Sequence, residues 1–333
     1  EVIKPSVPTF LPPMPKGAPA NRLGLAQWLT RPDHPLTARV AVNRYWSLLF
    51  GKGMVKSVSD FGTQGEWPSH PELLDWLAVD FVKHGWDIKR TLKQMVMSAT
   101  YRQSSRITRE LFTQDRSNAL LARGPRFRLQ GEFVRDNALA VSGLLVRDIG
   151  GTSVKPYQPA GLWKPVGFGG SNKSTFVQDK GDKLFRRSMY TFWKRTSPPP
   201  SMAAFNAPTR EQCTVRRERT NTPLQALVLM NDSQFVESAR HLAQNAMQQP
   251  DGQARAAWML TAVLGRPAES VDLAEMVAAA VNFRQVFRRE PAATQALIQT
   301  GDSPVDDTLD PTELATWTMV ANTLLNRDDF LNK

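Results

Sequence analysis

The sequence is nearly free of cysteine, and its only thiol, Cys213, excludes a disulfide within the chain. A single cysteine also excludes a zinc site built from a cysteine cluster and a CxxCH haem attachment in this segment. Histidine is scarce as well, because His34, His70, His84 and His241 lie far apart and form no HExxH pair. The sequence therefore predicts no dedicated metal site.

Long hydrophobic runs are also missing. The apolar run at residues 224–230 is far shorter than the roughly 20 residues that a membrane-spanning helix needs, so we expect no transmembrane segment. The chain begins at Glu1 and shows no charged region followed by an apolar stretch, which is the pattern of a signal peptide. We interpret it as a piece of a larger protein. No complete catalytic motif is recognisable in it.

Charge is abundant but unevenly placed along the 333 residues, whose formal net charge is +11. Residues 1–222 hold 34 Lys/Arg and 17 Asp/Glu, whereas residues 223–333 hold 8 and 14. A basic front part and an acidic end either attract each other or give the basic part an acidic partner. We therefore expect three segments, namely a proline-rich linker or strap (1–19), a basic and mainly helical body (20–222), and acidic C-terminal helices packed on that body (223–333).

Helical periodicity dominates the chain. Asn21 and Asp87 stand where N-caps are expected, and residues 69–72 and 222–225 match the pattern of capping boxes. The box at 222 predicts a helix to about residue 248. Residues 310–313 start a last predicted helix, which turns five apolar side chains inward, namely Leu314, Trp317, Val320, Leu324 and Leu325.

Two segments depart from the helical pattern. Residues 150–181 are rich in glycine, proline, lysine and serine, which predicts a long irregular insertion. Residues 188–194 alternate and favour a short strand, whose partner would come from the preceding loop. The predicted fold class is mainly α, a multi-helix globular domain with a long irregular Gly/Pro-rich insertion and a minor β element.

Several ordered strings resemble one family. They are NRYW at 43–46, DFG at 60–62, PSHPELLDWL at 68–77, SATYRQSS at 98–105, RERTNTPLQAL at 217–227 and ND at 231–232. Together they resemble the planctomycete-specific C-terminal domain of unknown function, over nearly the whole chain from about residue 21.

This resemblance implies a place in a larger protein rather than a reaction. In that family the domain commonly follows a cytochrome-c-like domain, so it implies an exported, extracytoplasmic, multidomain parent. The partners would be the missing N-terminal domains. No cofactor is expected in this chain, while a c-type haem would belong to an upstream domain.

The first candidate cluster combines Arg44, Trp46, Trp67 and His70. As a site, Arg44 would bind an anion, a tryptophan would stack on a sugar or planar ring, and His70 would move protons. As structure, the same residues would tie a helix to a loop, and we favour that interpretation for His70. In the second cluster, Arg102 would either cap the end of its helix or reach a carboxylate or sulfate.

The third cluster interleaves basic and aromatic residues around Arg187 and Trp193, which suits a polyanion as well as it suits a half-buried strand. The fourth surrounds Cys213 with Arg216 and Glu218. A thiol among arginines would be reactive, but a lone cysteine is more often a small buried hydrophobe, which we expect here. We expect Glu218 to pair with a neighbouring arginine, and it is the best candidate carboxylate for general acid/base chemistry.

These observations favour a non-catalytic binding or scaffold module of an exported, cytochrome-linked protein, with an acidic polysaccharide as a reasonable ligand. The alternative is a polysaccharide-active enzyme, or an oxidoreductase domain that passes electrons to an upstream haem. Whether the chain is an enzyme stays open at this point. Nucleic acid is an unlikely partner because no reading motif is present and the basic residues are scattered.

Overall fold

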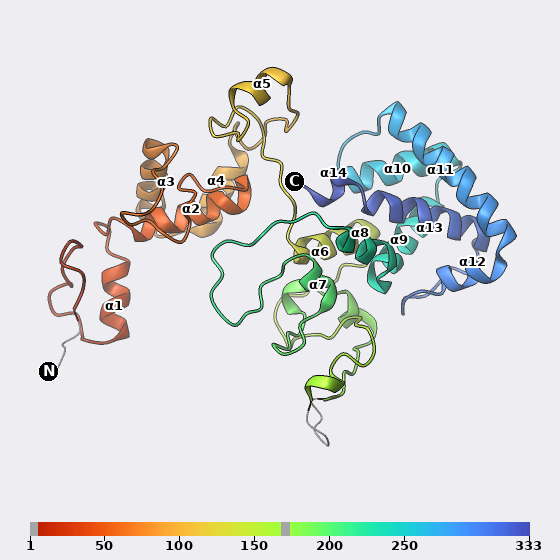
Figure 1. The fold of residues 1–333 in the computed structure, drawn as a ribbon, viewed down its shortest axis with the longest axis horizontal. Helices are drawn as coiled ribbons and strands as arrows, with labels where there is room; N and C mark the ends of the chain where they lie inside the picture. Colours follow the sequence, from red (N-terminus) through yellow and green to blue (C-terminus); the bar gives the residue numbers. More distant parts are fainter. Residues whose placement is uncertain (1–5, 168–173) are drawn as a thin grey trace. The chain divides into compact units, whose positions relative to one another are not determined.

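The structure, a computed structural model, describes residues 6–167 and 174–333. Within these residues the chain forms fourteen α-helices and a few 3-10 helices, and its β structure consists of three isolated bridges. The predicted mainly α class is confirmed. The chain divides into two compact units, one ending at Phe127 and the other beginning at Arg128. Figure 1 follows both units from the N-terminus to the C-terminus.

The first unit contains five helices: α1 (Arg22–Leu29), α2 (Thr37–Phe50), α3 (Pro71–Lys83), α4 (Ile88–Met97) and α5 (Arg109–Gln114). Asn21 caps α1 by accepting hydrogen bonds from the N–H groups of Leu23 and Gly24, and Asp87 caps α4, as the sequence predicts. His70 rather than Ser69 is the N-cap of α3, and it makes no side-chain capping bond. The capping box predicted at residues 69–72 is therefore not formed.

Helices α2 and α3 pack together around the core of this unit. Trp46 stacks on Phe50 with 3.8 Å between ring centroids, and both rings are buried. The buried amide of Asn43 donates to the carbonyl of Val55 and accepts from its N–H, each at 3.0 Å. The C-terminal part of α2 thus supplies both apolar core residues and the tie that fixes the following loop.

The described residues of the second unit form nine α-helices. They are α6 (Gly131–Ser142), α7 (Pro200–Ala204), α8 (Pro223–Asn231), α9 (Ser233–Ala246), α10 (Gly252–Leu264), α11 (Ser270–Arg289), α12 (Pro291–Ile298), α13 (Pro311–Leu325) and α14 (Asp328–Leu331). Helix α13 packs against α9, α11 and α12, and Figure 1 shows it among these neighbours. Its five predicted inward residues are each at most 1% exposed, so that prediction is confirmed.

The helix predicted from 222 to about 248 is two helices, α8 and α9, because Asp232 leaves the helical conformation between them. Its carboxylate accepts a hydrogen bond from the N–H of Gln234 at 3.1 Å and caps α9. Thr222 makes no side-chain capping bond, so the capping box at 222–225 is absent. At the last helix, in contrast, Asp310 accepts from the N–H of Glu313 at 2.8 Å.

The strand predicted at residues 188–194 is wrong. Residues Ser188–Tyr190 form a 3-10 helix, η4, and Thr191 makes a single bridge to Val154. Two other short 3-10 helices lie in the same region, η1 (Lys164–Val166) and η3 (Gly181–Phe185). The alternating pattern reflects a backbone that turns every third residue rather than one that extends.

The stretch that follows the irregular segment, residues 184–188, is held to the helices by the buried Arg135 of α6, which is 2% exposed. Its guanidinium donates to the carbonyl of Leu184 at 2.6 Å, to that of Arg186 at 2.9 Å and to the amide oxygen of Gln234 at 2.5 Å. Burial lowers the pKa of Arg135 to about 10, although the nearby charge of Asp136 opposes this. These hydrogen bonds tie the end of η3 and the residues after it to α6 and α9.

The boundary between the basic and acidic stretches differs from the boundary between the two compact units. The charge boundary expected at residues 222 and 223 lies inside the second unit, and the three-part division stays a prediction. Several acidic residues beyond 222 pair with arginines of the same stretch, such as Glu313 with Arg284 and Asp272 with Arg327. Across the described residues, no helix combines the length and the apolar character that a bilayer crossing requires.

Candidate functional site

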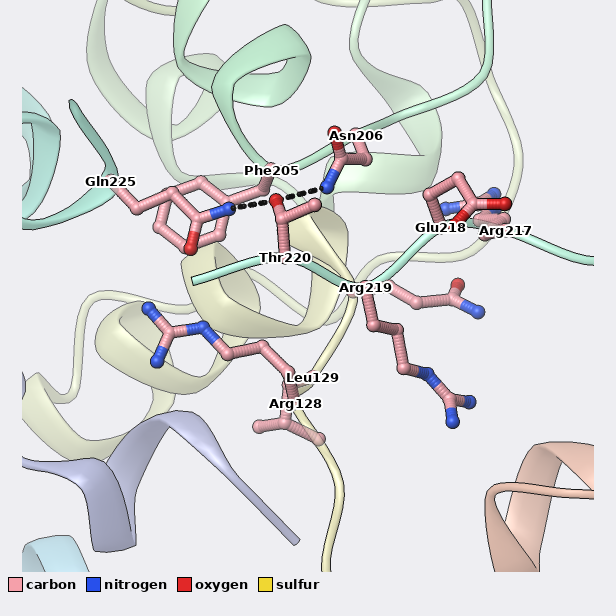
Figure 2. A pocket seen from close by; sticks show the side chains of 10 residues that line it. Arg128, Leu129, Phe205, Asn206, Arg217, Glu218, Arg219, Thr220 and Gln225 are labelled. Carbon is pink, nitrogen blue, oxygen red and sulfur yellow. Dashed lines mark hydrogen bonds between the residues drawn. The ribbon is translucent and has the colours of Figure 1, made fainter. Parts of the chain in front are cut away.

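The second unit contains a small pocket, of about 250 Å³, lined by three segments and one helix residue (Figure 2). Residues 128–130 precede α6, residues 205–206 follow α7, and residues 217–220 precede α8, which contributes Gln225. Its innermost space holds about one water molecule. Three parts of the chain, 128–130, 205–206 and 217–225, therefore meet at one hollow.

Arg128 is the best anchored of the lining arginines. The backbone of Arg128 forms an isolated antiparallel β-bridge with that of Asn332. The backbone N–H of Leu129 donates to the carbonyl of Leu331 at 2.9 Å. The half-buried guanidinium of Arg128 lies 6.0 Å from the centre of the Phe205 ring. Burial lowers the pKa of Arg128, while the charge of Asp328 acts in the opposite direction.

The segment at 217–220 is fixed at both ends. Arg217 donates to the carboxylate of Glu132 on α6 at 2.7 Å. The hydroxyl of Thr220 accepts from the amide of Asn206 at 2.6 Å and from that of Gln225 at 3.2 Å, as the dashed lines in Figure 2 show. Arg219, which lies between these ties, keeps an exposed side chain at the pocket.

Two buried polar atoms of the lining side chains have no hydrogen-bond partner among the described residues. They are Nε of Arg128, a donor, and Oε1 of Gln225, an acceptor. Gln225 is 1% exposed, and its amide nitrogen is already bound to Thr220 and to the carbonyl of Ala204. Buried polar atoms normally find partners, so the pocket wall lacks one donor and one acceptor that a bound group or water would supply.

Charge at the pocket is positive on balance. Arg128, Arg217 and Arg219 line it together with one carboxylate, Glu218. Glu132 offsets Arg217, and Glu218 lies 3.7 Å from Arg216, with both of these last side chains largely exposed. The arrangement suits a small anionic group and, through the unpartnered atoms, one neighbouring polar group.

Five of the nine residues singled out from the sequence belong to the first unit. Arg44 and Arg102 are exposed, and Trp67 is 93% exposed. Trp46 is 5% exposed in the core, which leaves it no free face for a ligand. His70 accepts or donates only one side-chain hydrogen bond among those described, with Ser69 at 3.0 Å. A hollow of about 560 Å³ in this unit is lined by none of the five.

The other four belong to the second unit and lie at different places. Glu218 lines the arginine pocket, and Arg216 neighbours it through the 3.7 Å contact. Arg187 pairs with Asp136 at 3.7 Å. Trp193 lines a separate open hollow, and its indole N–H donates to the carbonyl of Thr209 at 3.1 Å.

Cys213 is exposed, so its expected role as a small buried hydrophobe is wrong. Within the described residues there is no group of three or more His, Cys, Asp or Glu side chains that could hold a metal ion.

Sequence reasoning missed Arg128 and Gln225, the two residues that give the pocket its unpartnered atoms. Gln225 stood inside a string read as a capping box, where its role would be local. The structure instead turns its amide toward Thr220 and Ala204. Arg128 follows a loop of ordinary composition and carries no local signal.

The fold and site thus define a mainly α protein with an arginine-lined pocket. The family model described as PSD1, protein of unknown function (DUF1553), matches residues 21–280. The chain belongs to this family. The pocket residues all lie within the matched span. No curated protein and no solved structure matches the chain.

Proposed function

We propose that the chain is a non-catalytic binding module whose arginine-lined pocket binds an acidic group of a polysaccharide at its mouth, outside the innermost space that holds about one water molecule. A sulfate or carboxylate matches the flat, forked donor pattern of guanidinium groups. A polysaccharide supplies such groups beside hydroxyls, and hydroxyls both donate and accept hydrogen bonds.

The observation that carries the proposal is that the Arg128 guanidinium is incompletely satisfied by the protein. Its guanidinium is partly desolvated, and its Nε lacks a hydrogen-bond partner among the described residues. Removing a charged group from water is costly unless another group takes the place of water. Asp328 acts on this charge, and an acidic ligand would add a direct partner on the pocket side.

The surroundings of the two carboxylates near the pocket favour binding over catalysis. Glu132 is engaged by Arg217 at 2.7 Å, and Glu218 is solvated and lies close to Arg216. A general acid or base works best with a pKa near the working pH, which burial away from cations would provide. Neither carboxylate has such surroundings.

The wider setting follows from the resemblance of the sequence strings. We propose an extracytoplasmic parent protein in which domains upstream of this chain carry a c-type haem. The unit described here would then tether that parent to an acidic polymer, and the haem domain would be the partner within the same protein.

The test compares binding of acidic and neutral glycans to the whole chain at low ionic strength. Isothermal titration with a sulfated glycan, a uronate glycan and neutral dextran should give binding to the acidic glycans alone. Arg128→Gln should weaken that binding about tenfold or more, since a charge-assisted hydrogen bond is worth about 1.5–3 kcal/mol.

Arg288→Gln is the matched control, because Arg288 is an exposed arginine on α11 and does not line the pocket. It should change the affinity by less than about twofold. The proposal fails if the unaltered chain binds dextran as well as it binds the acidic glycans. It also fails if Arg128→Gln and Arg288→Gln, both shown to be folded by circular dichroism, bind alike.

A further inference from the structure

A second hollow, wider and more open than the arginine pocket, lies on the irregular part of the second unit. It encloses about 650 Å³ and is lined from three stretches, namely Ser153, residues 189–193 with Arg195, and Arg210. None of these residues lines the arginine pocket. The bridge between Thr191 and Val154 brings the first two stretches together.

Two aromatic rings of the hollow each carry a guanidinium on one face. Arg186 lies 3.9 Å from the centre of the Tyr190 ring, and Arg210 lies 4.6 Å from that of Trp193. The Tyr190 hydroxyl accepts from the N–H of Gly150 at 2.8 Å, and the Trp193 indole donates to Thr209. Both rings are therefore held in place, and both line the hollow, so a ligand in the hollow would contact them.

Arg210 has an unusual backbone conformation. Its φ of 63° lies in the left-handed region, which a non-glycine residue adopts at a cost in strain. That conformation accompanies the stacking of its guanidinium on Trp193. The side chain is exposed, and none of the salt bridges among the described residues includes it. A stacked arginine keeps the edge of its guanidinium for hydrogen bonds to an acid group.

The hollow also contains a buried hydroxyl. Thr191 is 4% exposed, and its Oγ1 has no hydrogen-bond partner among the described residues. A hydroxyl can donate and accept, so the group that best satisfies it does the same. A sugar hydroxyl meets this condition. Benzoate, an aromatic acid that could also stack on the rings, offers acceptors alone.

Met189 completes the lining with an apolar side chain that is 60% exposed. Arg195 adds a second cation, which pairs with Glu211 at 3.1 Å. Both members of that pair are more than half exposed, so an acidic ligand could displace it at little cost. Aromatic faces, a polar floor and cations at the rim are thus combined in one hollow.

We infer that this hollow is a second subsite, which binds one acidic sugar ring by stacking it on Trp193 and Tyr190 and engaging its acid group with Arg210. The inference rests on the proposed function, because the same acidic polysaccharide would fill both places. Two linked contacts bind a polymer more tightly than either contact alone, through raised effective concentration.

The first experiment uses a single sugar ring, so that it reports on the hollow alone. The indole N–H resonance of Trp193, assigned through Trp193→Phe, is followed by nuclear magnetic resonance during titration of the whole chain. D-glucuronate should shift this resonance in a saturable way, glucose should shift it much less, and benzoate should not compete. An unmoved resonance at saturating glucuronate, or equal shifts with glucose or benzoate, would overturn the inference.

The second experiment uses variants with matched controls. Trp193→Ala should weaken glucuronate binding roughly tenfold, whereas Trp76→Ala, which removes an equally large and 53% exposed ring on α3, should leave it unchanged. Arg210→Gln should reduce the preference for glucuronate over glucose. If Trp193→Ala unfolds, the resonance titration and Arg210→Gln still decide the matter.

Failure of the subsite is distinguishable from failure of the proposed function. If Arg128→Gln abolishes binding of the acidic polymer while Trp193→Ala and Arg210→Gln leave it unchanged, the hollow is no subsite and the pocket proposal stands. If glucuronate binds at Trp193 while Arg128→Gln leaves polymer binding unchanged, the hollow stands and the arginine pocket fails.

Discussion

Asp232 shows how a single side chain sets the course of the chain at an energetic cost. Its carboxylate caps α9 and ends α8, so it creates the turn between two helices. Burial raises the pKa of this carboxyl, although hydrogen bonds from Gln234 and the charge of Arg135 act in the opposite direction. The cap is therefore useful, while the negative charge is partly desolvated.

Asparagine caps a helix about as well as aspartate and carries no charge. At neutral pH, the free energy of unfolding of Asp232→Asn should therefore lie within about 0.5 kcal/mol of that of the unaltered protein. The free energy of unfolding of Asp232→Ala should be lower by about 1 kcal/mol, because alanine cannot cap the helix. A raised pKa contributes stability that is complete below the unfolded pKa and is lost as pH rises through the folded value. The free energy of unfolding of the asparagine variant should thus rise relative to that of the unaltered protein as the pH rises from the ordinary aspartate pKa through the raised pKa of the folded chain.

Urea unfolding at several pH values measures these differences. If the asparagine variant were as unstable as the alanine variant at neutral pH, the carboxylate would have a role beyond capping.

Residues of the site were predictable only where their role is local. Trp193 stood out because basic and aromatic residues interleave around it, and it lines a hollow. Gln225 and Arg128 meet across almost a hundred positions of sequence, and nothing in the neighbourhood of either one specifies that meeting. Trp46 was predicted as a ligand-binding candidate but lies in the core, 5% exposed. The sequence does not separate these two roles, because tryptophan packs in hydrophobic cores as well as against sugars.

Among the structural elements, the short 3-10 helices around residues 184–188 are tied to α6 by Arg135, which donates to the carbonyls of Leu184 and Arg186. Lysine in place of Arg135 would keep a charge but could not reach the carbonyls of Leu184 and Arg186 together. Buried acceptors would lose their donors, so Arg135→Lys should lower the free energy of unfolding by about 2–4 kcal/mol.

Arg187→Lys provides the control for this prediction. Arg187 also faces Asp136, at 3.7 Å, but its side chain is 45% exposed. Arg187→Lys should lower the free energy of unfolding by less than about 0.5 kcal/mol. Hydrogen exchange at residues 184–190 should quicken in Arg135→Lys alone, and equal effects of the two variants would contradict the anchoring role.

Element boundaries were predictable where an apolar period and a cap agree, as at Asp310 and α13. The break between α8 and α9 was missed because apolar residues continue on both sides of Asp232. The short strand was wrong because alternation over seven residues also fits a 3-10 turn followed by a single bridge. Residues in a loop obey distant hydrogen bonds, such as those of Arg135, which periodicity does not encode.

For the whole molecule, charge should govern binding far more than folding. The second unit has a large apolar core around α9 and α13, whereas an ion pair such as Lys180 with Asp302 is exposed at the lysine. Raising the salt concentration from about 0.02 M to about 0.5 M shortens the screening length from about 20 Å to about 4 Å. The free energy of unfolding should change by no more than about 1 kcal/mol, because exposed pairs contribute little.

Binding of an acidic glycan should weaken strongly over the same range of salt, since it depends on the charge of the arginines. Denaturant unfolding and glycan titration, carried out on one preparation, measure both effects. A fold that loses most of its stability in salt would show that the acidic and basic stretches hold each other by charge, as the sequence-based division at residue 222 expects.

The most direct measurement is a crystal structure of the chain with a sulfated, uronate-containing tetrasaccharide. The account predicts an acid group within hydrogen-bond distance of the Arg128 guanidinium in the pocket, with a sugar hydroxyl on Oε1 of Gln225. A tetrasaccharide bound elsewhere, with only water between Arg128 and Gln225, would contradict it.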